Sequence, residues 1–137
     1  MNNNRMRKLQ GDQLLESERF RVVRLLEKCP DGMTRSKDII EHPGSVGIVP
    51  FVDDDQVCLI NVFRPAVGRT LIEIPAGTLD RVESISAAAH RELREETGYQ
   101  AAFLESIGEL WMSPGILHEK MHLFVAKGLQ SGSQSLE

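Results

Sequence analysis

GTLDRVESISAAAHRELREETGY, residues 77–99, is the stretch that decides the fold. Within it, Ser84–Thr97 predicts a helix, because alanine and leucine favour helical backbone and Ser84 can cap the first turn. Gly98 stands where a helix commonly ends in a left-handed residue. One side of this helix is apolar and can pack on a sheet; it carries Ala88, Ala89 and Leu93.

The other side of the same predicted helix is crowded with charge. Glu92 and Glu96 are four residues apart and share a face, with Glu95 adjacent. Like charges at this spacing are mildly destabilising unless a cation lies between them. Carboxylates without histidine or thiolate suit a hard ion such as Mg²⁺ or Mn²⁺. The simpler interpretation is a solvated face on which Arg91 and Arg94 pair with these glutamates.

The spacing of the whole stretch is more specific than the helix alone. It reads Gly77, five residues, Glu83, seven residues, and then Arg91-Glu92-Leu93-x-Glu95-Glu96-x-Gly98-Tyr99. This pattern resembles the Nudix box, Gx5Ex7REUxEExGU, where U is a bulky apolar residue, and every fixed position matches. The resemblance implies a Nudix hydrolase, which cleaves a nucleoside diphosphate linked to another group.

The resemblance also implies a fold and roles for the box residues. The expected fold is α/β (α+β), an α/β/α sandwich with a mixed sheet and, in this chain, an N-terminal β-hairpin. Glu92 and Glu96 would bind Mg²⁺ or Mn²⁺, and Glu95 would be a further ligand or a base beside it. Arg91 would orient the carboxylates by ion pairing, and Glu83 would brace the loop.

Flanking residues resemble the ADP-ribose pyrophosphatase branch of that family. The matching stretches are FRPAVGRTLIEIPAG, residues 63–77, and SPG, residues 113–115. Carried over, the carbonyl of Ala76 is a metal ligand, and Arg64 contacts a phosphate. The remaining residues expected near the substrate are Glu73, Ser113, Pro114, Gly115 and Glu119. Two simpler interpretations stay open, with Arg64 as a surface strand-end residue and Glu119 as a solvated loop residue.

The leading functional hypothesis is Mg²⁺-dependent hydrolysis of ADP-ribose to AMP and ribose 5-phosphate. One alternative is a pyrophosphatase for another nucleotide sugar such as GDP-mannose, because the box reads the diphosphate and not the base. Another is a Nudix-fold binding module with little turnover. Members of the branch usually continue into another strand and a terminal helix, with a glutamate base in a late loop. We therefore expect a domain that is either shortened at its C-terminus or lacks that base.

HEKMH, residues 118–122, has the spacing of a zinc hydrolase motif. Zinc binding through it needs a helix, but Pro114 and Gly115 precede it and MHLFVA reads as a strand. In an extended segment the two histidines would lie about 13 Å apart, at about 3.3 Å per residue. We therefore predict a loop leading into a strand, with His118 and His122 outside any metal site.

The chain divides into three predicted parts. Residues 1–17 are expected to be a flexible N-terminus, 18–45 a hairpin, and 46–137 the catalytic domain, whose strands are predicted near 45–52, 56–63, 70–74, 101–111 and 121–126. A hairpin alone is marginal in water, and this one carries Phe20, Val22, Leu25 and Leu26. In the resembling branch this region packs on a second subunit, so we expect a homodimer.

Composition excludes several classes of protein. A net charge of −4 and 5% aromatic residues argue against nucleic-acid binding. No apolar run is long enough to span a membrane and no leader opens the chain. Cys29 and Cys58 form no CxxC pair, which favours a reducing, cytoplasmic setting. The expected partner is therefore a nucleoside diphosphate-sugar substrate.

Overall fold

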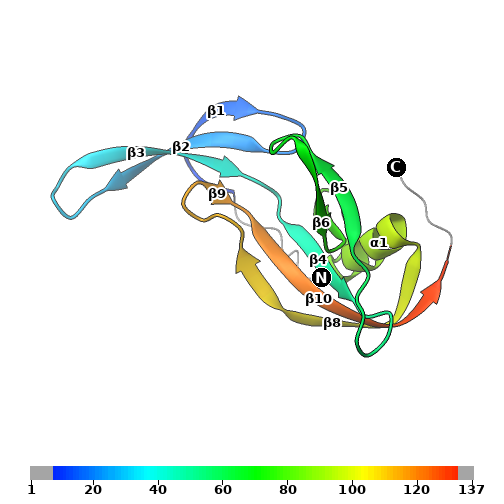
Figure 1. Cartoon of the computed structure of the whole chain (residues 1–137). Helices are drawn as coiled ribbons and strands as arrows, with labels where there is room; N and C mark the ends of the chain where they lie inside the picture. The colour runs from blue at the N-terminus through cyan, green and yellow to red at the C-terminus, as the bar shows by residue number, and fades with distance from the viewer. Residues whose placement is uncertain (1–7, 133–137) are drawn as a thin grey trace.

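The structure is a computed structural model that describes residues 8–132 (Figure 1). In chain order its elements are β1 (Asp12–Glu16), β2 (Arg21–Lys28), β3 (Thr34–Glu41), β4 (Ser45–Pro50), β5 (Ile60–Arg64), β6 (Arg69–Glu73), β7 (Ala76–Thr78), α1 (Ile85–Thr97), β8 (Tyr99–Trp111), β9 (Leu117–His118) and β10 (Lys120–Ser131). The strands form two four-stranded sheets and one two-stranded sheet.

The central sheet is mixed and has the strand order β7-β4-β10-β8. β4 runs parallel to β10 and antiparallel to β7, and β10 runs antiparallel to β8. β4 is nearly continuous in apolar residues, as expected of a strand between two neighbours that is covered on both faces. Its Val46 and Ile48 are fully buried. The predicted mixed sheet is confirmed.

The predicted helix is also confirmed. The Ser84 hydroxyl accepts a hydrogen bond from the Ala87 amide at 3.1 Å, and Gly98 ends the helix at φ 76°. Its apolar side packs on the central sheet, in a core formed by Val46, Ile48, Ala88, Ala89, Leu93, Phe124 and Ala126. The helix is thereby fixed on one face of the sheet, with its charged side turned away from the core.

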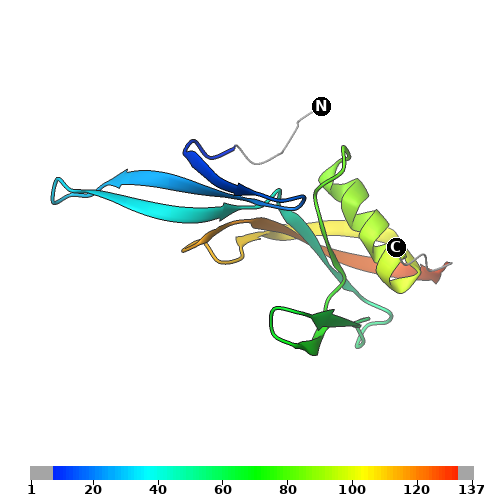
Figure 2. The same cartoon turned by 90° about the horizontal axis from the view of Figure 1, so that it is seen from above.

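The β5–β6 hairpin lies on the other side of the central sheet from α1 (Figure 2). Gly47 lies between Val46 and Ile48, which pack with the helix, and a Cβ atom at Gly47 would lie 3.1 Å from Cδ1 of Ile74, which follows this hairpin. Residues 8–132 contain one helix, α1. The face of the central sheet opposite α1 therefore carries the β5–β6 hairpin in place of the second helical layer expected for an α/β/α sandwich. No helix in the same range is long and apolar enough to cross a membrane.

The N-terminal region forms a separate sheet with the order β1-β2-β3-β9, which projects from the central sheet (Figures 1 and 2). The predicted hairpin is present as β2 and β3, joined around Gly32 at φ 79°. The stretch predicted as a flexible N-terminus, 1–17, differs from that expectation, because Asp12–Glu16 pairs with β2 as β1. Residues 1–7 lie outside the described range.

Candidate active site

Gly77 lets β7, the strand before α1, come close to the charged side of the helix. A Cβ atom at this position would lie 1.9 Å from the carboxyl carbon of Glu92, far closer than any real contact. With Glu92 in this position there is no room for a side chain at residue 77, and a larger residue would make the Glu92 carboxylate shift. This close approach explains why the first position of the box is a glycine. It also places the Glu92 carboxylate beside the Ala76–Gly77 peptide bond.

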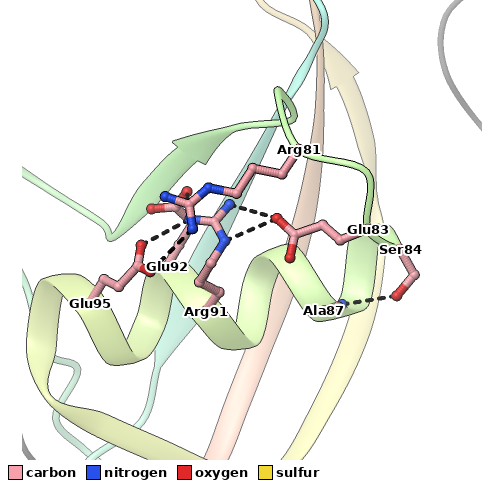
Figure 3. Close-up of polar contacts among 7 residues, drawn as sticks. All are labelled: Arg81, Glu83, Ser84, Ala87, Arg91, Glu92 and Glu95. Carbon is pink, nitrogen blue, oxygen red and sulfur yellow. Dashed lines mark hydrogen bonds and ion pairs between the residues drawn. The ribbon is translucent and has the colours of Figure 1, made fainter. Parts of the chain in front are cut away.

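Arg91 is the centre of the carboxylate cluster (Figure 3). It donates to Glu83 Oε1 from Nε at 3.0 Å and from Nη2 at 2.7 Å. Its Nη1 donates to Glu92 Oε1 at 2.7 Å and to Glu95 Oε2 at 2.9 Å. Burial by itself lowers the pKa of Arg91, but these hydrogen bonds outweigh it and raise that pKa. The guanidinium stays charged and fixes the positions of three glutamates.

Glu96 is held from the opposite side, by backbone. The Ala76 amide donates to Glu96 Oε2 at 2.8 Å. Burial raises the pKa of the Glu96 carboxyl and so does the charge of Glu92, while the Ala76 hydrogen bond and Arg64 act in the other direction. The net result is a raised pKa. Glu92 and Glu96 therefore both lie against the start of β7, at Ala76 and Gly77.

These side chains line one cleft of about 420 Å³. Its walls come from the β1–β2 turn, the β3–β4 connection, the end of β5, β7, the loop between β7 and α1, and α1 itself. The lining residues are Glu18, Arg19, Pro43, Arg64, Ala76, Gly77, Thr78, Asp80, Arg81, Arg91, Glu92, Glu95 and Glu96. All the box carboxylates expected on the metal side are among them.

Sequence reasoning missed several of these residues. Glu18 and Arg19 belong to a turn of the N-terminal sheet, and no local pattern connects that turn with the helix. Asp80 and Arg81 occupy variable positions of the box, between Gly77 and Glu83, so the motif assigns them no role. Their charges within the loop were the one available signal. Arg81 Nη1 lies 3.7 Å from Glu95 Oε1.

Arg64 lines the cleft and is paired with Glu73. Its Nε and Nη2 donate to the two Glu73 oxygens at 2.9 and 2.6 Å, in a two-point contact between β5 and β6. This hydrogen bonding raises the pKa of Arg64 and lowers that of Glu73. Arg64 therefore forms part of the cleft wall, and Glu73 holds its guanidinium in place.

The other residues predicted near the substrate lie apart from the cleft. Ser113, Pro114 and Gly115 form a turn in which the Ser113 carbonyl accepts from the Leu117 amide at 2.8 Å. Glu119 accepts from the Ser45 hydroxyl at 2.7 Å, and its side chain is 16% exposed. Glu119 is therefore not a solvated loop residue. None of these four residues lines the cleft in the described chain.

The donor set of the cleft suits a hard divalent cation. Glu92, Glu95 and Glu96 offer carboxylate oxygens, and the Ala76 carbonyl belongs to the segment against which two of them rest. Across residues 8–132, however, no three acidic, histidine or cysteine side chains already converge as a metal centre. The carboxylate oxygens are of the type that a hard divalent cation prefers, and in this structure Arg91 and the Ala76 amide bind several of them instead.

HEKMH lies in extended structure, as predicted. His118 ends β9 and His122 lies in β10. Buried His118 Nδ1 has no hydrogen-bond partner among the described residues, while His122 Nδ1 lies 3.4 Å from Glu109. The strand geometry removes the helix that the zinc motif needs.

Comparisons with known proteins identify relatives of this chain. A family model described as the NUDIX domain matches residues 41–136. The chain is 39% identical to an ADP-ribose pyrophosphatase of Bacillus subtilis (strain 168) over 102 residues, covering 74% of this chain and 55% of that protein. It is 35% identical to a methanol dehydrogenase activator of Bacillus methanolicus over 130 residues, covering 90% of this chain and 70% of that protein.

A solved structure gives the same result at the level of the fold. The crystal structure of an ADP compounds hydrolase matches with a TM-score of 0.77 and 28% identity, covering 95% of this chain and 74% of that chain. The chain thus spans about half the length of the ADP-ribose pyrophosphatase it matches and about three quarters of the solved structure.

Proposed function

The chain belongs to the NUDIX domain family, and from this we propose that it hydrolyses ADP-ribose to AMP and ribose 5-phosphate with Mg²⁺ or Mn²⁺. Nudix hydrolases generally use divalent metal ions. The observation that carries the proposal is the convergence of Arg64 with Glu92, Glu95 and Glu96 in one cleft. The similarity to an ADP-ribose pyrophosphatase supports the choice of substrate.

The box residues supply the negative charge of the site. Glu92, Glu96 and the Ala76 carbonyl would hold the cation, with Glu95 beside them as ligand or base. The bound cation would supply positive charge to the diphosphate and increase the acidity of water. Arg91 holds the carboxylates around one guanidinium group and orients them through its four hydrogen bonds. Glu83 in turn holds Arg91 in place.

Arg64 would offset charge on the phosphate that is not attacked. Its Glu73 partner holds the guanidinium in a fixed direction, so that little side-chain freedom is lost when a phosphate binds. Glu73 thus acts on the substrate through Arg64. Ser113, Pro114, Gly115 and Glu119 stay proposed substrate residues, for parts of the substrate beyond the cleft.

We also propose a homodimer that acts in the cytoplasm. The apolar residues of the N-terminal sheet support the first part, since Leu26 is 70% exposed and Phe20 is 39% exposed. Exposed apolar groups of this size favour a covered face. The two cysteines are free, which accords with a reducing compartment.

The test is a Mg²⁺-dependent assay of the purified protein over ADP-ribose, GDP-mannose and other nucleoside diphosphate sugars. We expect ADP-ribose to be preferred by about tenfold or more in kcat/KM, with AMP and ribose 5-phosphate as products. Equal, slow turnover of every substrate would contradict the assignment. Binding of ADP-ribose without turnover would favour the binding module instead.

A further inference from the structure

His42 stands in the short connector between the N-terminal sheet and the central sheet. β3 ends at Glu41 and β4 begins at Ser45, so His42, Pro43 and Gly44 make up the whole connection. Gly44 has φ 100°, a backbone conformation that favours glycine. Pro43 lines the cleft. A change in this connector therefore reaches both the cleft wall and the N-terminal sheet.

One ring nitrogen of His42, Nδ1, faces two different groups. The Gly44 amide donates to it at 3.2 Å. The Glu119 oxygen Oε1 lies 3.6 Å from the same nitrogen, just beyond the length of a hydrogen bond. The His42 and Glu119 side chains are 17% and 16% exposed, so both groups are largely shielded from water. Nδ1 thus has one donor and one acceptor as its neighbours.

These two neighbours need opposite states of the His42 ring. A ring nitrogen that accepts from an amide carries no proton, which leaves the proton of the neutral ring on Nε2. A bond from Nδ1 to the Glu119 carboxylate requires a proton on Nδ1, and that nitrogen can then accept from no amide. The two bonds therefore exclude each other. Histidine side chains change charge between about pH 5 and 8, so ordinary changes of pH can select one bond or the other.

Both partners of His42 are connected to the site. The Gly44 carbonyl accepts from the Leu79 amide at 2.9 Å, at the start of the loop between β7 and α1. Gly44 is buried, and a buried amide that loses its acceptor is unfavourable, so protonation of His42 would disturb the connector. Glu119 Oε1 already accepts from the Ser45 hydroxyl at 2.7 Å. A charged imidazole would add a second and stronger bond to the same oxygen.

Other charged groups surround His42 in a pocket of about 300 Å³ beside the cleft. They come from the segment before β1, the β1–β2 region, the end of β3 and the loop before α1, and they are Lys8, Glu16, Glu18, Arg19, Arg21, Glu41 and Asp80. Arg21 and Glu41 bind each other. On the side of β9, the His118 carbonyl accepts from the His42 amide at 3.2 Å. Acidic groups of the pocket outnumber basic ones by four to three, even before Glu119 is counted, so counter-charges for an imidazolium are at hand.

We propose that His42 is a proton-controlled positioning residue for Glu119. The neutral ring holds the Gly44 amide and leaves Glu119 Oε1 to the Ser45 hydroxyl and the substrate. The protonated ring releases Gly44, binds Oε1 and withdraws it from the substrate. The inference rests on the proposed function, in which Glu119 is a substrate residue, and its first test does not depend on turnover.

The first test is NMR of the full chain, labelled with nitrogen-15, from about pH 5 to 8.5. The ring nitrogens of His42 report where its protons are, and the Gly44 amide signal reports the bond to the ring. In the parent both should change over the same pH interval, with Nδ1 free of a proton at the upper end. Glu119→Gln should move this change to lower pH by about 0.5 or more, because the charged ring loses its counter-charge.

Two variants fix the two states of the connector. His42→Asn supplies an oxygen that accepts from the amide two residues on and takes up no proton, so the Gly44 signal should stay constant with pH. His42→Lys is charged throughout and accepts nothing, so the Gly44 amide should lack its acceptor at every pH. His122→Asn is the matched control, because His122 Nδ1 lies 3.4 Å from Glu109 Oε2 at 12% exposure, outside the cleft. It should behave as the parent does.

The second test is the pH dependence of KM for ADP-ribose. From pH 8 to pH 6, KM should rise by about three- to tenfold in the parent and stay within about twofold in H42N. In H42K it should be raised at both pH values, and kcat should follow the same pH dependence in the parent and in H42N.

The outcomes separate the inference from the function on which it rests. A Gly44 signal that is constant with pH in the parent, or that changes equally in the parent and H42N, would overturn the inference. So would a rise in KM that H42N shares with the parent. Coupled changes of His42 and Gly44 in a parent that does not cleave ADP-ribose would uphold the exchange of bonds at His42 and reject the proposed substrate.

Discussion

Glu96, on the charged side of α1, accepts a hydrogen bond from the Ala76 amide. Burial is the main cause of its raised pKa. The hydrogen bond, to Glu96 Oε2, fixes the carboxylate beside the start of β7. The Glu92 carboxylate lies against Gly77 in the same region, and a larger residue at position 77 would displace it. The positions of these two carboxylates therefore depend on the backbone of Ala76 and Gly77.

The change Glu96→Gln should remove most of the metal-dependent activity and keep the fold. The amide has the same volume and can still accept from Ala76, but it lacks the charge that a hard cation needs. We expect kcat to fall by about 100-fold or more at saturating Mg²⁺, a loss typical of removing one electrostatic group. Initial rates and circular dichroism are the measurements.

Glu105→Gln is the matched control, since Glu105 is an exposed residue of β8 outside the cleft. It should retain the parent's activity. Activity of E96Q within twofold of the parent would contradict the assignment of Glu96 to the cation.

At the scale of elements, local signals were readable in the sequence and long-range contacts were not. Ser84 and Gly98 cap the helix through neighbours within a turn, so the helix could be predicted with both its ends. The spacing of the box carboxylates follows from that helix. Glu119, by contrast, meets Ser45 across 74 residues, and no nearby pattern reports such a contact. β1 was missed for the same reason, because pairing with β2 creates it.

Glu41 links several segments of the N-terminal sheet. It ends β3, accepts hydrogen bonds from Arg21 and from the Leu9 amide, and pairs in register with His118 of β9. Burial would raise the pKa of its carboxyl, but Arg21 and Leu9 together lower it. A pKa below its unfolded value means that Glu41 stabilises the fold above that value and loses this effect as the pH falls.

We therefore expect Glu41→Gln to lower the free energy of unfolding by about 1 kcal/mol or more at pH 7, as for a lost charged hydrogen bond. The difference from the parent should shrink as the pH falls below about 4.5. Urea unfolding at several pH values measures it. Asp38→Asn, which removes an exposed pair with Arg24 in the same sheet, should have a smaller effect at pH 7. An E41Q deficit that is constant across this pH range would contradict the explanation.

At the scale of the whole molecule, the N-terminal sheet projects from the central sheet and carries apolar residues at its surface (Figure 1). Leu26 on β2 is 70% exposed, and Met33 in the β2–β3 turn is 60% exposed. The sheet also supplies Glu18 and Arg19 to the cleft, so its position bears on the site. A second copy that covers this surface would hold the sheet in place.

Sedimentation at micromolar concentration should show a species of twice the 15.3 kDa chain mass. Leu26→Glu should shift it toward the monomer, because a charge in an apolar interface is not compensated. Phe103→Glu is the control, since Phe103 is equally exposed at 72% but lies on β8. A 15.3 kDa species for the parent, or a dimer unchanged by L26E, would rule out this interface.

The parallel pairing of β4 with β10 has a consequence for synthesis on the ribosome. Ser45 pairs with Met121, so the strand at the centre of the core acquires this neighbour only after some 76 further residues have been added. At about 5–20 residues per second, the edge of SVGIVP that faces β10 waits about 4–15 s for its partner, whereas β7 and α1 are made earlier in that interval. The N-terminal sheet waits in the same way for β9. During that interval the nascent chain presents one unpaired edge of an apolar strand, an edge that favours pairing with other chains.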